Sequence, residues 1–399
     1  MFAIYNYIGL EENKGGPSGY LYHLNCGFQE NGYDIAILSD MSSAKRKKKV
    51  EVKRDKIEFI AQGRNILHFY KIGLKIKYES INNWNAYNVI HVMSSEDAYY
   101  LKKLYGYKGK IVLTSHKPES LADEKISGLN LRNGTNWKCR ILRIFYDYIE
   151  KKAYKLSDAF VFPSINSEAI YNNFPGYRKY SKGKTVKYVY TGCVEKKVTL
   201  DREFYRKNIG ISENDFAISY IGRHNYIKGY DLLADIGEKL IDNHINIICA
   251  GAKTTISYPL SPNWKELGFI SDVQNLINAS DAVVVPNRNT YFDLVVIEIL
   301  SMGKLVITSK TGGNIDIAKH TNGLILFEEG NKQSLYEAIL KVKNMKSEER
   351  NKLQRENYAF YCNYCSVKKF AQKYVMEIND ILNEFGCDCI NNKEVICDE

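Results

Sequence analysis

The sequence predicts an α/β protein made of two doubly wound, parallel-sheet domains that face one another across a cleft. Three observations lead to this prediction: short β-rich runs alternate with helical stretches, the runs are continuously apolar, and the series begins again near mid-chain. Alternating strands and helices form βα units on a parallel sheet, and a sheet covered on both faces needs strands that are apolar throughout. A chain of 399 residues is long enough for two such domains.

Each half of the chain carries its own series of expected strands. In the first half these are residues 1–8, 33–39, 88–93, 110–116 and 159–164, with amphipathic segments such as 19–30 between several of them. In the second half the expected strands are residues 215–223, 245–252, 281–287, 304–309 and 323–327, and the expected helices are 229–242, 272–279, 294–302 and 332–345. Doubly wound sheets bind ligands at the carboxyl ends of their strands.

The polar stretch from 196 to 214 separates the two series and sets the expected boundaries. The first domain is predicted to cover residues 1–195 and the second 196–366. We expect a C-terminal helix over residues 367–386 that packs back on the first domain, followed by a tail over 387–399.

The composition excludes several classes of protein. Hydrophobic residues make up 45% and charged residues 26%, which fits a folded chain rather than a disordered one. We find no apolar stretch long enough to span a membrane and no signal peptide at the start, so we expect a cytoplasmic protein. Nine cysteines are scattered, and the close pairs Cys362/Cys365 and Cys387/Cys389 lack a histidine-bearing zinc pattern. We therefore expect reduced thiols and no metal site.

The charge is concentrated in the first half. Residues 1–195 hold 31 Lys and Arg against 19 Asp and Glu, a balance of +12, whereas the remainder holds 25 against 27, a balance of −2. Two segments contribute most: residues 44–56 carry eight cations against two acids, and residues 136–156 mix cations with Trp137, Ile141, Leu142, Phe145 and Tyr146 at roughly helical spacing. Each could also be a solvated loop or a core-facing helix. No nucleic-acid-binding motif accompanies the charge, so an anionic membrane surface is the preferred partner.

Two cations follow the first strand of the second half. In "SYIGRHNYIKGYDLL" (219–233) the strand ends before Gly222, and Arg223 and Lys228 lie on the following loop, before Gly229 opens a helix. Two cations at the carboxyl edge of a strand, beside a helix N-terminus, can clamp a diphosphate. The alternative is that both are solvated loop cations.

A single carboxylate, Glu298, interrupts the apolar run in "NTYFDLVVIEILSMGKLVITSKTGGN" (289–314). If a helix begins at Leu294, its first N–H groups suit an anion, and Glu298 lies about one turn further in. A carboxylate there could accept hydrogen bonds from a vicinal diol such as a ribose. Otherwise it lies on the wet edge of the helix.

These segments together resemble a known family. "YIGRHNYIKGYDLL", "AGA", "ELGFISDVQNLINASDAVVVPN", "YFDLVVIEILSMGKLVITSKTGGN" and "HTNGLILFEEG" follow one another in the order and spacing of the retaining glycosyltransferases of family 4. "NKGGPSGYLYHLNCGFQENGYDIAIL" is similar to their N-terminal glycine loop and first helix, and "VLTSHKPE" to their histidine-bearing strand end. The resemblance spans about residues 1–385 and implies the GT-B fold, which has two Rossmann-like domains.

The resemblance implies a role for each matching position. In the first domain, Gly15 and Gly16 match the loop that approaches the donor diphosphate, and His116 matches a histidine near the reaction centre. In the second domain the matches are Arg223 and Lys228 for the diphosphate, Glu298 for the donor ribose, Ile270 for the base, and the backbone of Phe292, Asp293 and Leu294 for the sugar and phosphates. No metal or other cofactor is implied, because the cations and the helix N-terminus supply the electrostatic stabilisation.

The sequence departs from the family pattern at two positions. The first acid of the Glu-x7-Glu motif is replaced by Thr290, and the glycine that usually follows the Phe is replaced by Asp293. In the family that first acid contacts a hydroxyl of the donor sugar. Its loss puts the common hexose donors in doubt, and Asp293 is the candidate for a substitute carboxylate.

The resemblance therefore implies a metal-independent, retaining enzyme that transfers a hexosyl or N-acetylhexosaminyl group from a nucleotide diphosphate sugar, with a UDP-sugar favoured as the donor. The expected acceptor is a lipid-linked bacterial surface glycan, such as O-antigen or capsule, on the inner face of the cytoplasmic membrane. Two alternatives stay open. A degenerate glycosyltransferase-like binding subunit is favoured by Thr290 and opposed by Arg223, Lys228 and Glu298. A two-domain solute-binding protein is opposed by the lack of a signal peptide in the sequence.

Overall fold

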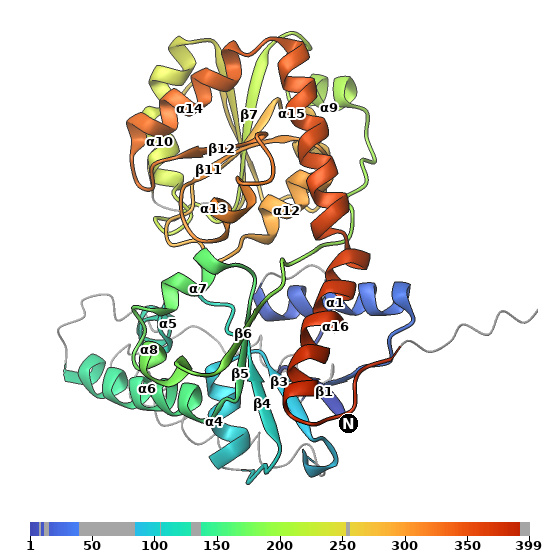
Figure 1. Ribbon diagram of the computed structural model, residues 1–399. Helices are drawn as coiled ribbons and strands as arrows, with labels where there is room; N and C mark the ends of the chain where they lie inside the picture. Colours follow the sequence, from blue (N-terminus) through green and yellow to red (C-terminus); the bar gives the residue numbers. More distant parts are fainter. Residues whose placement is uncertain are drawn as a thin grey trace, which may run out of the picture. The chain divides into compact units, whose positions relative to one another are not determined.

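The computed structural model describes residues 1–7, 9–11, 16–39, 84–103, 105–128, 137–252 and 256–391. The chain divides into two compact units (Figure 1). Unit 1 contains residues 1–162, 171–189 and the chain from 371 on, and unit 2 contains residues 163–170 and 190–370. Each unit holds one six-stranded sheet.

Unit 1 is built on a parallel sheet with the strand order β2-β1-β3-β4-β5-β6. Its strands are β1 (Phe2–Tyr5), β2 (Ala36–Leu38), β3 (Val89–Val92), β4 (Lys110–Leu113), β5 (Ala159–Phe162) and β6 (Thr185–Tyr188). Its helices are α1 (Gly16–Asn31), η1 (Trp84–Ala86), α4 (Ser95–Lys103), α5 (Leu121–Gly128), α6 (Trp137–Leu156), α8 (Tyr177–Ser181) and α16 (Val367–Glu384), of which α16 enters the unit at Ala371.

The C-terminal helix α16 is tied to the sheet of unit 1 through a buried histidine. His91 of β3 lies 2.7 Å from the Tyr374 hydroxyl through Nδ1 and 2.7 Å from the Thr114 hydroxyl through Nε2. Tyr374 also contacts Phe28 of α1, with ring centroids 5.6 Å apart. Burial, together with nearby His116, lowers the pKa of His91 to about 3. His91 is thus a neutral core residue.

Unit 2 contains the second parallel sheet, with the order β12-β11-β10-β7-β8-β9. Its strands are β7 (Phe216–Ile221), β8 (Ile245–Ala250), β9 (Trp264–Gly268), β10 (Ala282–Val285), β11 (Leu305–Ser309) and β12 (Leu324–Phe327). Its helices are α9 (Arg202–Asn208), α10 (Tyr230–Asp242), α11 (Val273–Ala279), α12 (Leu294–Ser301), α13 (Gly313–Ile317), α14 (Lys332–Asn344), α15 (Ser347–Phe360) and the π-helix η2 (Tyr361–Cys365), while α7 (Ile165–Tyr171) lies in it up to Ile170.

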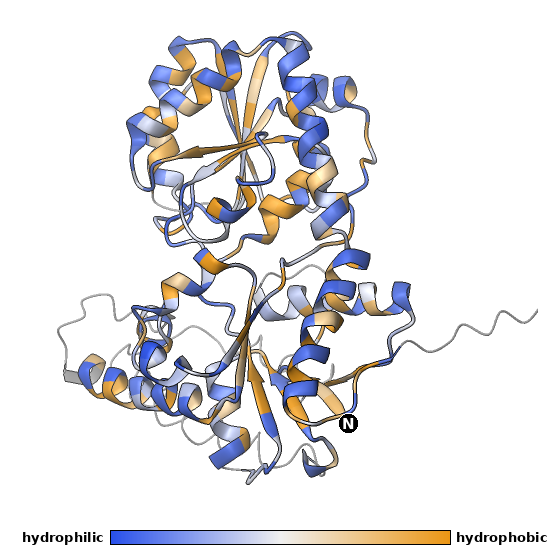
Figure 2. Ribbon diagram, viewed as in Figure 1, coloured by the Kyte–Doolittle hydropathy of each residue, from blue (hydrophilic) through white to orange (hydrophobic). Residues whose placement is uncertain are grey.

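Helices cover both faces of the unit 2 sheet. One apolar cluster joins the sheet to α10 and α14 through Leu233 and Ile339, and a second joins it to α9 and α11 through Tyr205 and Leu276. Every residue of β8, β10 and β11 is therefore buried, and Figure 2 shows the strands as mostly hydrophobic. This double burial is the reason that these strands are continuously apolar in the sequence.

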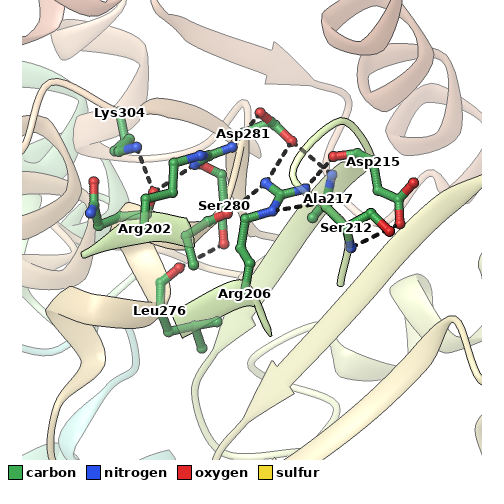
Figure 3. Close-up of polar contacts among 11 residues, drawn as sticks. Arg202, Arg206, Ser212, Asp215, Ala217, Leu276, Ser280, Asp281 and Lys304 are labelled. Atoms are coloured by element: carbon green, nitrogen blue, oxygen red, sulfur yellow. Dashed lines mark hydrogen bonds and ion pairs between the residues drawn. The ribbon is translucent and has the colours of Figure 1, made fainter. Parts of the chain in front are cut away.

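A buried arginine connects the elements at the amino-terminal edge of this sheet through hydrogen bonds and an ion pair (Figure 3). Arg206 of α9 donates to the Ala279 carbonyl at 2.9 Å and lies 3.6 Å from Asp281 Oδ2. The same Asp281 oxygen accepts the Ala217 N–H at 2.8 Å, and Asp281 Oδ1 pairs with Arg202 at 2.9 Å. These contacts fix the starts of β7 and β10 and the end of α11. The two neighbouring strands therefore have a fixed register, and both end at the opposite edge of the sheet.

The ten predicted strands and the four predicted helices of the second half are confirmed, and so is the predicted class of two doubly wound domains. Two edge strands, β6 and β9, were not predicted. Their residues are mostly half-buried and include Lys187 and Lys265, and an edge strand tolerates such charges because one side of it is uncovered.

The unit boundaries differ from the expected junction at residue 195. Tyr190 already belongs to unit 2, because Cys193 donates its N–H to the Cys365 carbonyl at 3.0 Å and its carbonyl accepts the Tyr361 hydroxyl at 3.0 Å. Residues 163–170 also join unit 2, where Ser167 donates to the Tyr291 carbonyl at 2.7 Å. The polar stretch 196–214, which was expected to open the second domain, contains α9, and α9 is part of the unit 2 core.

Candidate active site

The topology of unit 2 predicts a ligand crevice where β7 and β10 end. Counted from β9, the strands are added in one direction up to β7 and in the opposite direction from β10 on, and ligands of doubly wound sheets bind outside the carboxyl ends at that point. The loop after β7 carries Arg223, which is exposed, and Lys228, which is half-buried. The loop after β10 carries Thr290 and Asp293. The fold thus brings these four candidates to one edge of the sheet.

The two loops approach each other so closely that Gly229 has no room for a side chain. A Cβ at Gly229 would lie 1.9 Å from the Pro286 carbonyl oxygen, and the residue has a positive φ of 67°. Both observations require glycine. The start of α10 is therefore held against the end of β10.

Arg288 fastens the same two loops together, a role that was not predicted. Its N–H donates to the Ile227 carbonyl at 2.8 Å, and its guanidinium lies 3.8 Å above the Tyr226 ring. The guanidinium also forms two 2.8 Å bonds to the Asp231 carboxylate. A bidentate pair of this kind fixes orientation as well as distance. Arg288 thus sets how Lys228 faces the loop after β10.

Asp293 is the centre of a polar network in this crevice. Its Oδ2 accepts hydrogen bonds from the Asn287 amide at 2.7 Å and from the Thr290 hydroxyl at 2.8 Å. Its Oδ1 lies 3.5 Å from the Lys228 ammonium. The Asp293 carboxylate therefore lies next to position 290, and the buried Thr290 side chain holds it in place.

The first turn of α12 faces the same crevice. Asp293 is the N-cap residue of α12, but its side chain makes no capping hydrogen bond, because the carboxylate is turned toward Lys228, Asn287 and Thr290. Behind this turn, Gly312 has a positive φ of 51°, and a Cβ there would lie 1.7 Å from the Thr290 carbonyl oxygen. The backbone around Phe292, Asp293 and Leu294 is thus fixed from behind, as a site for an anion at a helix N-terminus requires.

Glu298 forms an ion pair with a lysine that was not predicted from the sequence. Lys196 Nζ lies 3.1 Å from Glu298 Oε1, and the two side chains are 27% and 20% exposed. The carboxylate is therefore neither fully buried nor on a wet helix edge. It is half-buried and paired with a cation about one turn beyond the start of α12.

The base-contact candidate lies at the end of the outermost strand of the sheet. Ile270 is half-buried and packs against the cluster under α9 and α11, while the preceding Phe269 is 85% exposed. Gly268 turns the chain here with a φ of 72°. β9 is separated from β7 by β8, so this position lies two strands away from Arg223.

In unit 1 the structure describes two of the three candidates. Gly15 and the basic run 44–56 lie outside the described residues. Gly16 starts α1 with a φ of 68°, a conformation that favours glycine. His116 follows β4, and its ring centroid lies 4.3 Å from that of Tyr20 of α1. Burial lowers the pKa of His116 to about 3, so the imidazole is neutral at pH 7.

The comparisons with known proteins agree with this geometry. Residues 201–360 match the family described as "Glycosyl transferases group 1". A glycosyltransferase of uncharacterised function from Methanocaldococcus jannaschii, MJ1607, is 28% identical over 135 residues, which cover 31% of this chain and 35% of that protein. A 42.6 kDa protein encoded in the cps region of Klebsiella pneumoniae is 24% identical over 295 residues, covering 64% and 76%. The chain thus spans about a third of the archaeal relative and three quarters of the bacterial one.

Solved structures show the same architecture over the whole chain. Sucrose-phosphate synthase of Thermosynechococcus elongatus aligns with a TM-score of 0.67 at 15% identity, covering 96% of this chain and 99% of that one. Anabaena HepE, in complex with UDP and glucose, aligns with a TM-score of 0.60 at 16% identity, covering 94% and 98%. The chain has the GT-B fold of these glycosyltransferases. Within its second unit, residues 201–360 are similar to the group 1 glycosyltransferases.

Two kinds of feature are absent from the part of the chain that the structure describes. Within it, no helix is both long and apolar enough to cross a membrane. Among the same residues, no cluster of three or more His, Cys, Asp and Glu side chains could hold a metal ion.

Proposed function

We propose that the chain is a glycosyltransferase that takes its sugar from a nucleotide diphosphate sugar, with UDP as the favoured nucleotide. The observation that carries the proposal is the contact between the loops after β7 and β10: Arg223 and Lys228 lie on the first loop, and α12 follows the second. Arg288 and Gly229 hold these loops together. The group 1 domain and the complex of HepE with UDP support the choice of donor.

The reaction would release a nucleoside diphosphate, so negative charge develops on the leaving phosphate in the transition state. Fixed positive groups that face this charge stabilise it without reorganising. In our proposal Arg223, Lys228 and the N–H groups of Leu294 and its neighbours do this, and no metal is needed. Retention of the anomeric configuration is part of the proposal and rests on the family resemblance alone.

Three further residues complete the proposed donor site. Glu298 would accept the ribose hydroxyls, and Ile270 would contact the base. Asp293 would accept a hydrogen bond from the donor sugar through Oδ1, since its Oδ2 already accepts bonds from Asn287 and Thr290. Lys228, at 3.5 Å, is a loose partner of Oδ1 and can turn toward a bound diphosphate.

We expect Glu298→Ala to weaken the binding of free UDP by about tenfold or more, because hydrogen bonds to a charged acceptor contribute about 1.5–3 kcal/mol. Calorimetric titration of UDP and GDP into wild type and variant measures this directly. The matched control is Glu328→Ala, which removes a carboxylate that pairs with Lys310 on the exposed surface. Equal UDP affinity in wild type and Glu298→Ala would rule out the ribose role.

We further propose that the acceptor is a lipid-linked surface glycan and that unit 1 meets it at an anionic membrane. The relative encoded in a cps region is consistent with a polysaccharide product. Helix α6 supplies a surface that suits the membrane: Ile141, Ile144 and Tyr148 are 56%, 72% and 49% exposed and lie on one face at spacings of three and four residues. Arg140 and Lys151 are exposed on the same side. Figure 2 shows the alternating apolar and hydrophilic bands of α6.

A row of apolar side chains flanked by cations is the pattern of a helix that lies in a membrane interface. Of the five apolar residues predicted in this segment, Leu142 and Tyr146 are core residues, Phe145 is half-buried and Ile141 is exposed. Nothing is described of the Trp137 side chain. The proposed docking face thus consists of the exposed side chains Ile141, Ile144 and Tyr148, and not of all five predicted residues.

We expect the triple variant Ile141→Ser/Ile144→Ser/Tyr148→Ser to bind anionic vesicles at least about tenfold more weakly than wild type. In wild type each of the three apolar side chains would move from water into the membrane interface, and serine lacks this gain. Co-sedimentation with phosphatidylcholine vesicles, with and without phosphatidylglycerol, measures the binding at two salt concentrations. Phe204→Ser on α9 of unit 2, where the side chain is 54% exposed, is the control. If wild type binds neutral and anionic vesicles equally, or the control loses as much binding, the docking proposal is wrong.

One observation favours a second function, a catalytically inactive binding subunit. Thr290 replaces an acid, and Asp293 pairs with the same Lys228 that would hold the diphosphate. Turnover of a nucleotide-sugar panel distinguishes the two functions, because only the enzyme releases nucleotide.

A further inference from the structure

The pair of Lys196 and Glu298 is held by a second connection between the same two segments. The backbone N–H of Lys196 donates to the Ser301 hydroxyl at 3.2 Å, and this hydroxyl donates to the Glu298 carbonyl at 2.7 Å. Ser301 is buried, and both hydrogen bonds are partly buried. The backbone of Lys196 is thus fixed near the last turn of α12, and its side chain reaches back one turn to the carboxylate.

The pair differs from an ordinary surface ion pair in its burial. Exposed pairs such as Lys332 with Asp235, whose side chains are 62% and 55% exposed, contribute little to stability because water screens both charges. Lys196 and Glu298 are half-buried at a distance of 3.1 Å, where removing one partner leaves a charge that is poorly solvated. The orientation of Glu298 therefore depends on Lys196.

The bonding capacity of the pair suits a diol. A carboxylate can accept through both oxygens, and an ammonium carries three N–H donors. In the structure Oε1 of Glu298 faces the ammonium. A hydroxyl that donates to Oε2 and accepts from Lys196 would be bound from both sides, and a ribose presents two adjacent hydroxyls of this kind.

We propose that Lys196 is a nucleotide-site residue that holds Glu298 in place and, together with it, recognises the ribose hydroxyls of the donor. This inference rests on the proposed function, because it deepens the donor site. It identifies the class of nucleotide that the site prefers: a ribonucleoside diphosphate over its 2′-deoxy counterpart. It also accounts for a carboxylate so close to the proposed phosphate site, since Lys196 offsets its charge.

The test is calorimetric titration of UDP and 2′-deoxy-UDP into wild type, Lys196→Met, Lys196→Arg, Glu298→Gln and the Lys196→Met/Glu298→Gln double variant. We expect Lys196→Met to weaken UDP by about tenfold, as the loss of a charged hydrogen bond does, and to weaken 2′-deoxy-UDP clearly less. Lys196→Arg should restore most of the UDP affinity. In the Glu298→Gln background the same lysine substitution should change the UDP affinity by no more than about twofold, because the two residues act as a unit.

The controls separate this role from a structural one. Lys332→Met removes the lysine of the exposed pair and should leave the UDP affinity as in wild type. Thermal unfolding without nucleotide shows whether Lys196→Met merely destabilises unit 2. If wild type binds UDP and Lys196→Met binds it equally well, the role of Lys196 is disproved while the donor site stands. The same holds if the lysine substitution weakens the binding of UDP and of 2′-deoxy-UDP by the same factor, both in the wild-type chain and in the Glu298→Gln chain. If wild type binds no nucleotide at all, the proposed function itself fails.

Discussion

Replacing Lys228 by alanine will lower the rate of sugar transfer by about 10²–10³-fold, the usual loss when one group that faces developing charge is removed from a preorganised site. Lys228 is well placed for this effect, because Gly229 and Arg288 fix its loop against the end of β10. The affinity for free UDP should fall much less, since the added charge on the leaving phosphate exists only in the transition state. The measurement is single-turnover transfer or donor hydrolysis, with UDP titration alongside.

A complication in this experiment is that Lys228 also faces Asp293. Loss of the lysine could act by leaving that carboxylate without its cation, in which case Lys228→Ala would cost little further rate in a chain that already carries Asp293→Asn. If the lysine acts on the diphosphate, we expect the Lys228→Ala/Asp293→Asn double variant to be much slower than Asp293→Asn alone. A rate for Lys228→Ala within about threefold of wild type would show that Lys228 does not face the reaction.

Sequence reasoning reached the fold because the elements of unit 2 are locally consistent. β8, β10 and β11 are buried at every residue, and a buried strand leaves a continuous apolar run that can be found without the structure. The edge strand β9 was not predicted because most of its residues are only half-buried. Its Lys265 and Glu266 interrupt the apolar run that would identify a strand. The junction differs from the predicted one because residues just before 195 are held in unit 2 by partners far away in the sequence: Cys193 bonds to Cys365 and Tyr361.

The candidate site could be predicted only in part, because spacing finds residues on one loop but not the contacts between loops. Arg223 and Lys228 follow an expected strand, and that position made them candidates, whereas Asp293 became a candidate through the family resemblance. Lys196 lies about a hundred residues before Glu298, and no local pattern connects the two. Asn287 and Arg288 did carry a signal, because polar residues directly after a buried strand lie at the ligand edge of a parallel sheet. Their position after the strand could therefore have identified both residues from the sequence alone.

The two departures from the family pattern are one feature in the structure, which changes how they should be tested. Thr290 donates its hydroxyl to Asp293 Oδ2, and Asn287 donates to the same oxygen. A glutamate at position 290 would bring a second carboxylate against Asp293, and two like charges in a partly buried site repel. Thr290→Glu alone therefore confounds donor choice with repulsion. The informative variant is Thr290→Glu/Asp293→Gly, which restores the family pattern at both positions.

We expect Asp293→Asn to slow sugar transfer by about 10–100-fold, because a charged acceptor is lost from the position proposed to face the donor sugar. The affinity for free UDP should stay within about threefold of wild type, since UDP lacks the sugar. Thr290→Glu/Asp293→Gly should bind UDP normally and rank donor sugars in a different order from wild type. Turnover across a panel of nucleotide sugars, with UDP titration for each variant, measures both effects. If the double variant keeps the wild-type ranking, neither position faces the sugar, and the Asp293 network only holds the loop after β10 in place.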